Sequence, residues 1–546
     1  MDKLLFIVPP HISFDDFINP PFNVKTMRKK GRNYGSTFTD MPLGLLAMSA
    51  YLKKHTDAET RLVDFSVELN KLEEYDFNSF GDFFSSILSM PRWIEYAPSI
   101  IAISALFTSS YRSVLDIAKC CRDIFSHCVI VAGGGVPTNL YKEIFRDSAC
   151  IDALCYGEGE KPLLGLVKAN DKLPYFEGNP SWITRKKVEI GQSFHHEFIE
   201  NLDEIPFFDY GICELDNYGL NPAISAYASI DDKKHNFHVM TSRGCTHHCC
   251  FCSSHTVHGR KMRYYSIDRV KNDFIRLRDH YGAKTIIFQD DHFVADKQRA
   301  FKIIEIVKEL QITAIFQNGL ALYALDRKML EALKSAGLNQ IVLAVESGSN
   351  RVLKEIMHKP LNLSIVKRVA DDCRELGIYT NVNILLGLPG ETKQDIEDTR
   401  SFLKTINANW FIILCAAPLV GSEMLDICLK KNYLRGSYID CDYKKTVVET
   451  EDFTAEYIRE MTYILNLELN FVENSDFRLG NYKMALKGFE NAIRAKSDHA
   501  LGHYYAAQCY EKLGNYEKAS QYMNIFKMEA EKPFWRKYLD MFNIQL

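Results

Sequence analysis

Short apolar runs alternate with amphipathic helical patterns from Lys3 to about Lys168. Runs of this length, rich in branched aliphatic residues, are typical of buried parallel strands. The segments between them repeat their apolar residues every three or four positions, which predicts helices. The alternation indicates an α/β domain with a doubly wound, five-stranded sheet over residues 1–169. The predicted strands are LLFIVPP, TRLVDFS, IIAISALF, CVIVAGGG and DALCYGEG, and the clearest helices are PLGLLAMSAYLKK and SSYRSVLDIAKCCRDIF.

A second alternation begins at His238 and continues to about residue 435. Six strand–helix units in succession predict a partial barrel of parallel strands over residues 236–435. In such barrels the chemistry lies at the carboxyl ends of the strands. The predicted strands are HVMTSRG, TIIFQDD, TAIFQNG, QIVLAVES, YTNVNILLGLP and WFIILCAAP, and the predicted helices are RVKNDFIRLRDHYG, KQRAFKIIEIVKEL, DRKMLEALKSAG, IVKRVADDCRELG and TKQDIEDTRSFLKTI.

Two segments break these patterns. Residues 11–40 form a polar insertion that is too long for a turn, and such loops are usually functional lids or disordered. Residues 170–235 are irregular and are interpreted as a linker, with a small hairpin expected near SWITRKKVEI.

Residues 436–546 are predicted to be helical and contain a repeat at about 466–533. Gly480, Tyr482, Ala485 and Phe489 return as Gly514, Tyr516, Ala519 and Met523, each 34 residues later. This is the tetratricopeptide period. Two units are fewer than the roughly three needed for independent stability, so we expect these helices to pack against the barrel. Whether they also bind a peptide or a protein partner is left open.

Composition narrows the range of functions. The chain has 546 residues, a net charge of −4 and 47% hydrophobic residues, so it offers no general basic surface for nucleic acid. No apolar run reaches the roughly 20 residues of a membrane-spanning helix. MDKLLFIVPP is interpreted as a strand and not as a signal peptide, and the 15 cysteines then favour a reducing cytoplasm.

The segment TSRGCTHHCCFCSS carries the most specific chemistry. Cys245, Cys249 and Cys252 form a CxxxCxxC pattern. Three thiolates at this spacing can hold a 4Fe-4S cluster and leave one iron open. A structural zinc site would need four ligands, and a disulfide is unexpected without a secretory signal. Cys250 is adjacent to Cys249 and is expected to point elsewhere.

This loop resembles the radical S-adenosylmethionine superfamily, in which an aromatic residue, here Phe251, precedes the last cysteine. The phrases FQDDHF, VLAVESGSNRVLKEIMHK and ILLGLPGET are similar to those of cobalamin-linked members, and the similarity covers about 240–420. The resemblance implies that the open iron binds S-adenosylmethionine. It also implies that one electron, from a donor such as flavodoxin or ferredoxin, generates a 5′-deoxyadenosyl radical.

Carried over by position, the resemblance implies an S-adenosylmethionine site at the barrel strand ends. Glu346 would contact the ribose or the methionine moiety, and Leu388 and Pro389 would border the adenine. The alternative for the acidic residues is helix capping, as expected of Asp296. The candidate residues for this cofactor are Phe251, Gln289, Asp290, Asp291, Glu346, Leu388 and Pro389.

The amino-terminal phrases PLGLLAMSAYLKK, VAGGG and CYGEGEKPL look like the cobalamin-binding domain of one branch of this superfamily, and NLDEIPFFDY is similar to the segment that bridges the two domains. The chain lacks the motif DxHxxG, whose histidine binds cobalt in other cobalamin enzymes. Many members of this branch also lack that motif. A vestigial domain without cofactor is the alternative. The candidate cobalamin residues lie after the strands, where such folds bind ligands: Ser104, Thr108, Gly133, Gly134, Gly135, Gly157 and Glu158.

Several histidines stand near predicted strand ends or in the cysteine loop. His247 and His248 could tune the cluster through hydrogen bonds. The others could orient a substrate or act as a base, but with no partner visible in the sequence they are interpreted as ordinary loop residues. They are His11, His255, His258 and His292.

The resemblance implies a methyltransferase acting on an unactivated carbon, or on phosphorus, of a specialised metabolite, peptide or lipid. No catalytic side chain is assigned, because hydrogen abstraction by a radical needs no side-chain base. One alternative is a cyclase, oxidase or rearrangement enzyme in which cobalamin does not methylate or is absent. Another is a cluster-bearing scaffold that recruits a partner through its carboxyl-terminal helices.

Overall fold

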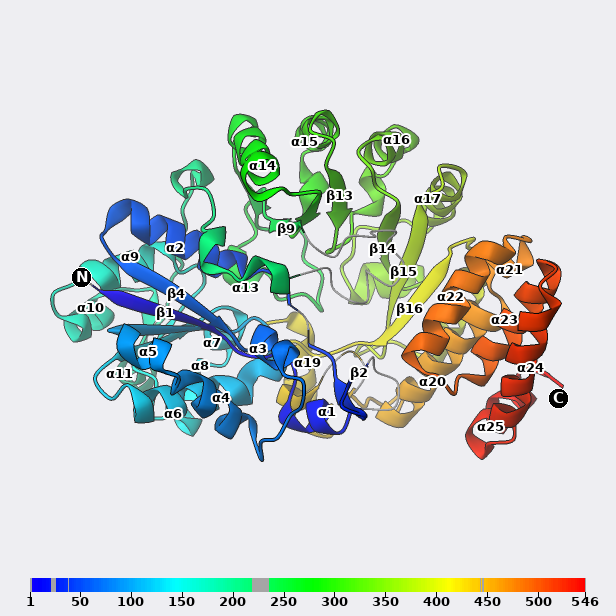
Figure 1. The fold of residues 1–546 in the computed structure, drawn as a ribbon, viewed down its shortest axis with the longest axis horizontal. Helices are drawn as coiled ribbons and strands as arrows, with labels where there is room; N and C mark the ends of the chain where they lie inside the picture. Colours follow the sequence, from blue (N-terminus) through cyan, green and yellow to red (C-terminus); the bar gives the residue numbers. More distant parts are fainter. Residues whose placement is uncertain are drawn as a thin grey trace.

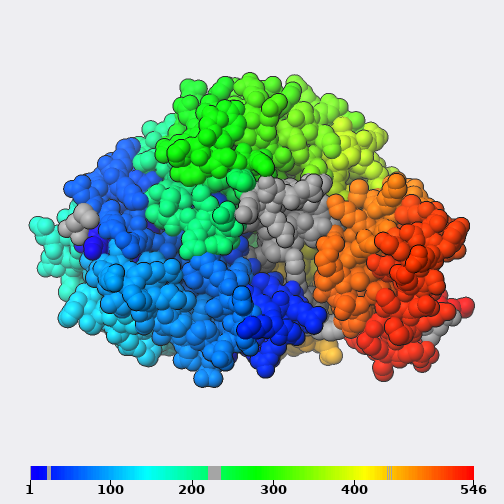
Figure 2. Space-filling model, in the orientation of Figure 1, coloured from blue at the N-terminus to red at the C-terminus, as the bar shows by residue number. Residues whose placement is uncertain are grey.

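The structure, a computed structural model, describes residues 2–20, 26–37, 39–218, 235–441, 443 and 446–545. Three parts follow one another along an arc: an amino-terminal sheet domain, a central half-open barrel and a bundle of carboxyl-terminal helices (Figure 1). The space-filling view shows the helical part at the opposite end of the arc from the sheet domain (Figure 2).

The amino-terminal domain is a doubly wound sheet with strand order β4-β1-β5-β6-β7-β8. Alternate residues of β1 enter different cores: Leu5 and Ile7 pack under α4 and α6, whereas Leu4 and Phe6 pack under α2 and α9. All five predicted strands and both predicted helices are confirmed. The elements are β1 (Lys3–Val8), β4 (Glu59–Asp64), β5 (Ile100–Ser104), β6 (Val129–Gly133), β7 (Ala153–Cys155), β8 (Trp182–Ile183), α2 (Leu43–His55), α3 (Phe65–Lys71), α4 (Phe80–Leu88), α5 (Pro91–Tyr96), α6 (Tyr111–Ile124), α7 (Gly135–Asn139), α8 (Tyr141–Asp147), α9 (Glu160–Lys168) and α10 (Lys172–Gly178).

The hairpin expected near SWITRKKVEI is wrong. The sixth strand, β8, pairs antiparallel with β7 and extends the domain sheet. The Thr184 side chain accepts a hydrogen bond from the Lys187 backbone N–H and thereby caps α11 (Arg185–Glu189). The segment therefore turns into a helix where a second strand was expected.

The described part of the polar insertion is folded. It forms α1 (Phe14–Ile18) and an antiparallel hairpin of β2 (Thr26–Lys29) and β3 (Arg32–Gly35). Phe17 is buried and stacks on Tyr34 with ring centroids 5.2 Å apart. Aromatic packing therefore anchors the insertion on the sheet domain.

The central part contains the six predicted parallel strands as two adjoining sheets, β13-β12-β9 and β14-β15-β16. The first strand ends earlier than expected, at Val239, and Ser242–Arg243 forms the separate strand β10, paired antiparallel with β11 (Arg263–Tyr264). The strands are β9 (Asn236–Val239), β12 (Thr285–Phe288), β13 (Thr313–Phe316), β14 (Gln340–Glu346), β15 (Tyr379–Leu386) and β16 (Trp410–Cys415); the covering helices are α14 (Ile267–Tyr281), α15 (Lys297–Glu309), α16 (Arg327–Ser335), α17 (Ser364–Glu375), α18 (Lys393–Lys404) and α19 (Glu423–Lys431).

The carboxyl-terminal helices repeat at the backbone level. Gly480 and Gly514 adopt φ values of 79° and 78°, and each is followed by an asparagine and the first residue of a helix. The 34-residue spacing thus corresponds to equivalent turns, while the tetratricopeptide relationship stays a prediction. The helices are α20 (Ala455–Leu467), the π-helical η9 (Glu468–Val472), α21 (Ser475–Arg478), α22 (Tyr482–Ala495), α23 (Ala500–Lys512), α24 (Tyr516–Ala530) and α25 (Pro533–Met541).

These helices pack against the barrel, as expected. Two asparagines from α20 and η9 pair with the backbone of β16: Asn470 with Phe411 and Asn466 with Ile413. Side-chain amides thereby occupy the strand edge that the barrel leaves unpaired. The buried carboxylate of Asp476 adds an ion pair to the barrel.

Candidate active site between the sheet domain and the barrel

The cysteine loop leaves β10 through a glycine that no other residue could replace easily. Gly244 has φ of 93°, and a Cβ there would lie 2.4 Å from the Lys261 carbonyl oxygen. The Cys245 N–H donates to the Gly259 carbonyl, and the Cys252 N–H donates to the Cys249 carbonyl at 3.1 Å. These contacts curl the loop so that its three cysteines, each partly exposed, border the barrel opening.

The cysteine loop fits a cluster better than a single metal ion. Within the described residues, no three His, Cys, Asp or Glu side chains lie close enough to hold one ion. A cubane separates its ligand sulfurs by its own iron–sulfide core, so it accepts this wider arrangement. Burial raises the pKa of Cys245 to about 11, with Asp291 and the neighbouring thiols adding to the shift, so binding would release protons.

Cys250 points away from this group, as expected. It is 3% exposed and lies in the main hydrophobic core. Its N–H donates to the Met357 carbonyl at 3.0 Å, and its carbonyl accepts from the Met424 N–H at 2.9 Å. The residue therefore ties the loop to two barrel segments and does not face the cluster position.

Asp290 holds the beginning of the cysteine loop. Its buried carboxylate accepts hydrogen bonds from the Thr241 N–H at 3.0 Å, the Thr241 hydroxyl at 2.7 Å and the Ser242 hydroxyl at 2.5 Å. These bonds stop β9 and turn the chain into β10. The geometry favours a positioning role for Asp290 over direct contact with a cofactor.

Asp291 is the better candidate for a cofactor contact. Burial raises the pKa of its carboxyl group, with His258 lowering it, and the Gly244 N–H donates to it. Within the described part of the chain, its buried Oδ2 has no hydrogen-bond partner. An unsatisfied carboxylate oxygen beside the cysteine loop fits an ammonium donor.

Gln289 is the first of a series of hydrogen-bonded polar side chains that the sequence did not reveal. Its amide donates to Gln317 at 2.9 Å, and Gln317 donates to Asp40 at 2.8 Å. Asp40 in turn lies 3.2 Å from Nε2 of His238 on β9. The insertion thus reaches the barrel strand ends. Only the position of Gln317 near the end of the predicted strand TAIFQNG could have signalled this.

Glu346 ends β14 in a strained conformation. Its φ is 70°, where β14 shifts register against β15. A left-handed conformation costs a non-glycine residue about 1–2 kcal/mol. Burial raises the pKa of its carboxyl group, and Lys359, at 3.7 Å, lowers it. Strain in a buried acid at a strand end is typical of a functional residue, and Lys359, within the phrase EIMHKP, had not been singled out.

The GLPG turn after β15 is held by Glu391, another residue missed in the sequence. Leu388 and Pro389 are buried, and Phe251 packs partly buried against the same core. The Gly387 and Leu388 N–H groups donate to Glu391 at 2.6 and 3.2 Å. Burial raises the pKa of Glu391 to about 7. Its place in LLGLPGET was the available signal.

A group of two histidines and a tyrosine stands beside the cysteine loop. The rings of His247 and His292 lie 4.7 Å apart, and the Tyr323 hydroxyl lies 2.7 Å from Nε2 of His292 and 3.3 Å from Nε2 of His247. Burial lowers the pKa of His292 to about 4, with His247 and Lys359 acting in the same direction. His247 and His292 therefore do have partners, which their separation in the sequence concealed.

Most of the candidate cobalamin residues gather at the carboxyl edge of β5, β6 and β7. Gly134 has φ of 98°, and a Cβ there would lie 2.6 Å from the Ala105 carbonyl oxygen, so this glycine lets two loops approach. Beyond β5, Leu106 and Phe107 are 57% and 53% exposed. An exposed apolar step at strand ends fits a large, flat ligand. The residues brought to this edge are Ser104, Thr108, Gly133, Gly134, Gly135 and Gly157.

Glu158 is engaged elsewhere, in a buried ion-pair network. Its carboxylate lies 3.2 Å from Arg243, 2.6 Å from Arg263 and 2.9 Å from His258, and Arg243 also pairs with Glu160 at 2.7 Å. Burial would raise the pKa of Glu158, but its contacts with Arg243, Arg263 and His258 hold it well below its usual range. The network joins the sheet domain to the strand that leads into the cysteine loop, so Glu158 has no free oxygen for a cofactor.

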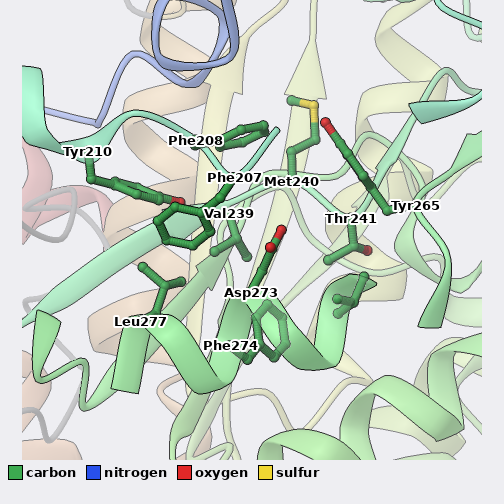
Figure 3. Close-up of a pocket in the computed structure, with 11 residues that line it drawn as sticks. Phe207, Phe208, Tyr210, Val239, Met240, Thr241, Tyr265, Asp273, Phe274 and Leu277 are labelled. Atoms are coloured by element: carbon green, nitrogen blue, oxygen red, sulfur yellow. The ribbon is translucent and has the colours of Figure 1, made fainter. Parts of the chain in front are cut away.

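A small cavity lies between β9 and α14 (Figure 3). It measures about 20 Å³ and is bordered by Phe207, Tyr210, Val239 and Phe274. Tyr265 also borders it, and the buried hydroxyl of this residue has no partner within the described residues. A space of this size holds one water molecule and no substrate.

Two family models match the domains that carry the two halves of this site. Residues 239–403 match the family model of the radical SAM superfamily, and residues 38–167 match that of the B12 binding domain. A cytidylyl-2-hydroxyethylphosphonate methyltransferase of Streptomyces wedmorensis is 26% identical over 468 residues, covering 79% of this chain and 86% of that protein. An uncharacterized methyltransferase of Pyrococcus horikoshii is 26% identical over 428 residues, covering 78% and 86%.

Solved structures share the fold. The cobalamin-dependent S-adenosylmethionine radical enzyme OxsB, with aqua-cobalamin and S-adenosylmethionine bound, aligns over 100% of this chain and 84% of its own, with a TM-score of 0.61 and 14% identity. The radical S-adenosylmethionine methyltransferase TsrM from Kitasatospora setae covers 80% and 78%, with a TM-score of 0.53 and 14% identity. Within the described residues, no helix is long and apolar enough to cross a membrane.

Proposed function

We infer that this chain, in which a B12-binding domain precedes a radical SAM domain, is a cobalamin-dependent radical S-adenosylmethionine methyltransferase. The observation that carries this inference is that the two cofactor edges meet. Asn139, at the end of the glycine loop and α7, donates to Thr256 at 2.9 Å in α13 (His255–His258), which follows the cysteine loop. Cofactors bound at the two edges would therefore be neighbours.

We propose distinct roles for the residues at this junction. Cys245, Cys249 and Cys252 would bind the 4Fe-4S cluster, and Asp291 and Glu346 would bind S-adenosylmethionine. Asp290 and Glu391 would hold the loops that present those groups. When bound, the cluster and S-adenosylmethionine supply a 5′-deoxyadenosyl radical, and cobalamin supplies the methyl group.

The proposed methyl acceptor is an unactivated carbon, or phosphorus, of a specialised metabolite, peptide or lipid. The Streptomyces wedmorensis relative, named for a cytidylyl phosphonate, supports a small-molecule substrate. An electron donor such as flavodoxin or ferredoxin is required by the proposed chemistry. All fifteen cysteines are free, which supports a reducing, cytoplasmic location. A protein partner at the carboxyl-terminal helices remains part of the hypothesis.

One observation favours a second candidate function. An anaerobic magnesium-protoporphyrin IX monomethyl ester cyclase of Cereibacter sphaeroides is 25% identical over 321 residues, covering 56% of this chain and 49% of that protein. A cyclase would use the same radical without transferring a methyl group. The greater coverage of the methyltransferase relatives favours methylation.

The test is anaerobic purification with hydroxocobalamin, followed by measurement of iron, sulfide and corrinoid and by incubation with labelled S-adenosylmethionine, a reductant and candidate acceptors. We expect about four irons and one corrinoid per chain, with 5′-deoxyadenosine and S-adenosylhomocysteine formed together with a methylated product. Formation of 5′-deoxyadenosine alone would favour the cyclase. Failure to cleave S-adenosylmethionine at full iron content would refute both.

A further inference from the structure

One histidine stands where the strand order of the amino-terminal sheet reverses. The chain runs from β1 to β4 on one side and returns to β5 on the other, so the strand order reverses between β1 and β5. Doubly wound sheets bind ligands beyond the carboxyl ends of the strands at this reversal. His11 follows β1 by only two prolines, and its ring meets Phe107, beyond β5, edge-on at 4.9 Å.

The hydrogen bonds around His11 select one tautomer. The Ser110 hydroxyl donates its single hydrogen to the Pro10 carbonyl at 3.0 Å. Nδ1 of His11 lies 3.3 Å from the same hydroxyl oxygen. Because that oxygen can only accept, Nδ1 must carry the ring hydrogen. Nε2 is then left with its lone pair, which is the form that binds a metal.

The position of the His11 ring is also fixed. The Ser109 hydroxyl donates to the His11 carbonyl at 3.1 Å, so the loop after β5 holds both the backbone and the ring. Burial lowers the pKa of His11 to about 4, with Asp40 opposing the shift, so the ring is neutral near pH 7. The hydrogen bond found for this ring within the described residues is the one at Nδ1.

The surroundings of His11 suit a planar metal complex. The exposed side chains of Leu106 and Phe107 form an apolar step beside the half-buried imidazole. An apolar surface with one neutral nitrogen donor set into it matches a corrin ring with cobalt at its centre. The chain lacks DxHxxG, so this residue belongs to no expected motif.

We propose that His11 supplies the axial nitrogen ligand to the cobalt of bound cobalamin through Nε2. This inference rests on the proposed function, because it requires that the sheet domain bind cobalamin. Ser110 is then a positioning residue that selects the tautomer. The ligand comes from the loop that follows β1, and its Nδ1–H is held by a serine hydroxyl in place of a carboxylate.

The test is electron paramagnetic resonance of the cobalamin-loaded holoenzyme in its Co(II) form, together with corrinoid content. A nitrogen ligand splits the cobalt lines. Growth on heavy-nitrogen histidine changes that splitting if the nitrogen is the protein's, and leaves it unchanged if it belongs to the cofactor's own base. We expect His11→Ala to lose the splitting while retaining corrinoid, Ser110→Ala to weaken it, and His127→Ala, an exposed control, to keep it.

The outcomes separate this proposal from the proposed function. Full corrinoid content with a splitting that survives His11→Ala, or with no nitrogen splitting in the unaltered protein, would overturn the His11 assignment alone. Should His11→Ala fail to fold, the labelled-histidine spectrum of the unaltered protein and the Ser110→Ala spectrum still decide. Absence of corrinoid from the unaltered protein would overturn both.

Discussion

The side-chain amide of Asn470 makes both hydrogen bonds that the Phe411 backbone offers on the open edge of β16, each at 2.8 Å. Asn466 repeats the arrangement with Ile413 one turn earlier in the helix. Residues four apart lie on one helix face, so two asparagines can match alternate residues of a strand. The barrel therefore closes on a helix at this edge, in place of a seventh strand.

Removing one of these amides should destabilise the barrel edge. Asn470→Ala leaves a buried N–H and a buried carbonyl of Phe411 unsatisfied, which costs about 2–4 kcal/mol in the free energy of unfolding. Hydrogen exchange of the Phe411 amide should become faster in the Asn470→Ala variant. Gln521→Ala, an exposed change on α24, is the control. Unchanged exchange at Phe411 would show that the amide does not cap the strand.

The buried network around Glu158 predicts a stability effect at the junction of the two domains. Glu158→Gln leaves Arg263 without its charged partner, and breaking such a pair costs about 3–5 kcal/mol. Because the pKa of Glu158 is lowered in the folded state, its contribution is present above the unfolded pKa and is lost as pH falls. Thermal unfolding near neutral pH measures the effect.

The matched control for Glu158 is Glu200→Gln, because Glu200 pairs with Lys261 at the surface. Surface pairs contribute about 0–1 kcal/mol, so its melting temperature should change little. Equal melting temperatures for the two variants would contradict the view that the network joins the domains.

The raised pKa of Glu391 predicts that its contribution to the free energy of unfolding changes with pH in the direction opposite to that of Glu158. Its pKa rises from 4.5 to about 7 on folding, so the native state binds the proton more tightly. Its contribution therefore lowers the free energy of unfolding as pH rises through that window, by about 3 kcal/mol in total. Glu391→Gln, which mimics the protonated acid, should remove this component.

The measurement is the difference in free energy of unfolding between Glu391→Gln and the unaltered protein at a series of pH values. Subtraction cancels the other titrating groups. Glu397→Gln, at a partly exposed acid on α18, is the control. A flat difference for Glu391→Gln would mean that the GLPG turn tolerates the ionised acid.

Two substitutions of Glu346 should have different effects, one on the stability of the fold and the other on cofactor binding. Glu346→Gly relieves the positive φ and should stabilise the fold by about 1 kcal/mol. Glu346→Gln removes a charge-assisted hydrogen bond and should weaken S-adenosylmethionine binding about tenfold, measured by equilibrium binding to reconstituted protein. Glu355→Gln, at an exposed acid in the π-helical turn Val352–Ile356, is the control. Unaltered affinity in Glu346→Gln would place the cofactor elsewhere.

The cysteine assignments predict which cysteine variants lose their iron and which one keeps it. Cys245→Ala, Cys249→Ala or Cys252→Ala should abolish cluster assembly, because three thiolates are needed to hold it. Cys250→Ala should keep the iron and lower only the melting temperature, since the side chain lies in the core. Loss of iron from Cys250→Ala alone, with the fold intact, would reassign the ligands.

Local patterns were enough to predict the strands, the order of the domains and the cysteine loop. Each depends on residues close together in the sequence, such as the apolar run Ile100–Ser104. Strand ends were less predictable: β9 stops at Val239 because Asp290, some fifty residues later, captures the Thr241 N–H. Side chains that meet across the fold leave no local signal.

The candidate site also contains contacts that local sequence could not predict, because the partners are far apart in the chain. Gln317 meets Asp40 across 277 residues of sequence, and the partners of Glu158 come from positions 243, 258 and 263. The phrase containing Glu158 resembled a ligand-binding loop, and its sequence could not show that the carboxylate was already occupied. Lys359 and Glu391 lay within phrases that had been identified, but their roles depend on burial.

The network at the domain junction also implies an order of events during synthesis. Glu158 and Glu160 leave the ribosome well before Arg243, His258 and Arg263. Until the barrel docks, the folded sheet domain carries both acids at a hydrated edge, where isolated charges cost little. Docking then removes the water and pairs the charges in one step. High salt during refolding should therefore slow domain assembly more than it slows folding of the sheet.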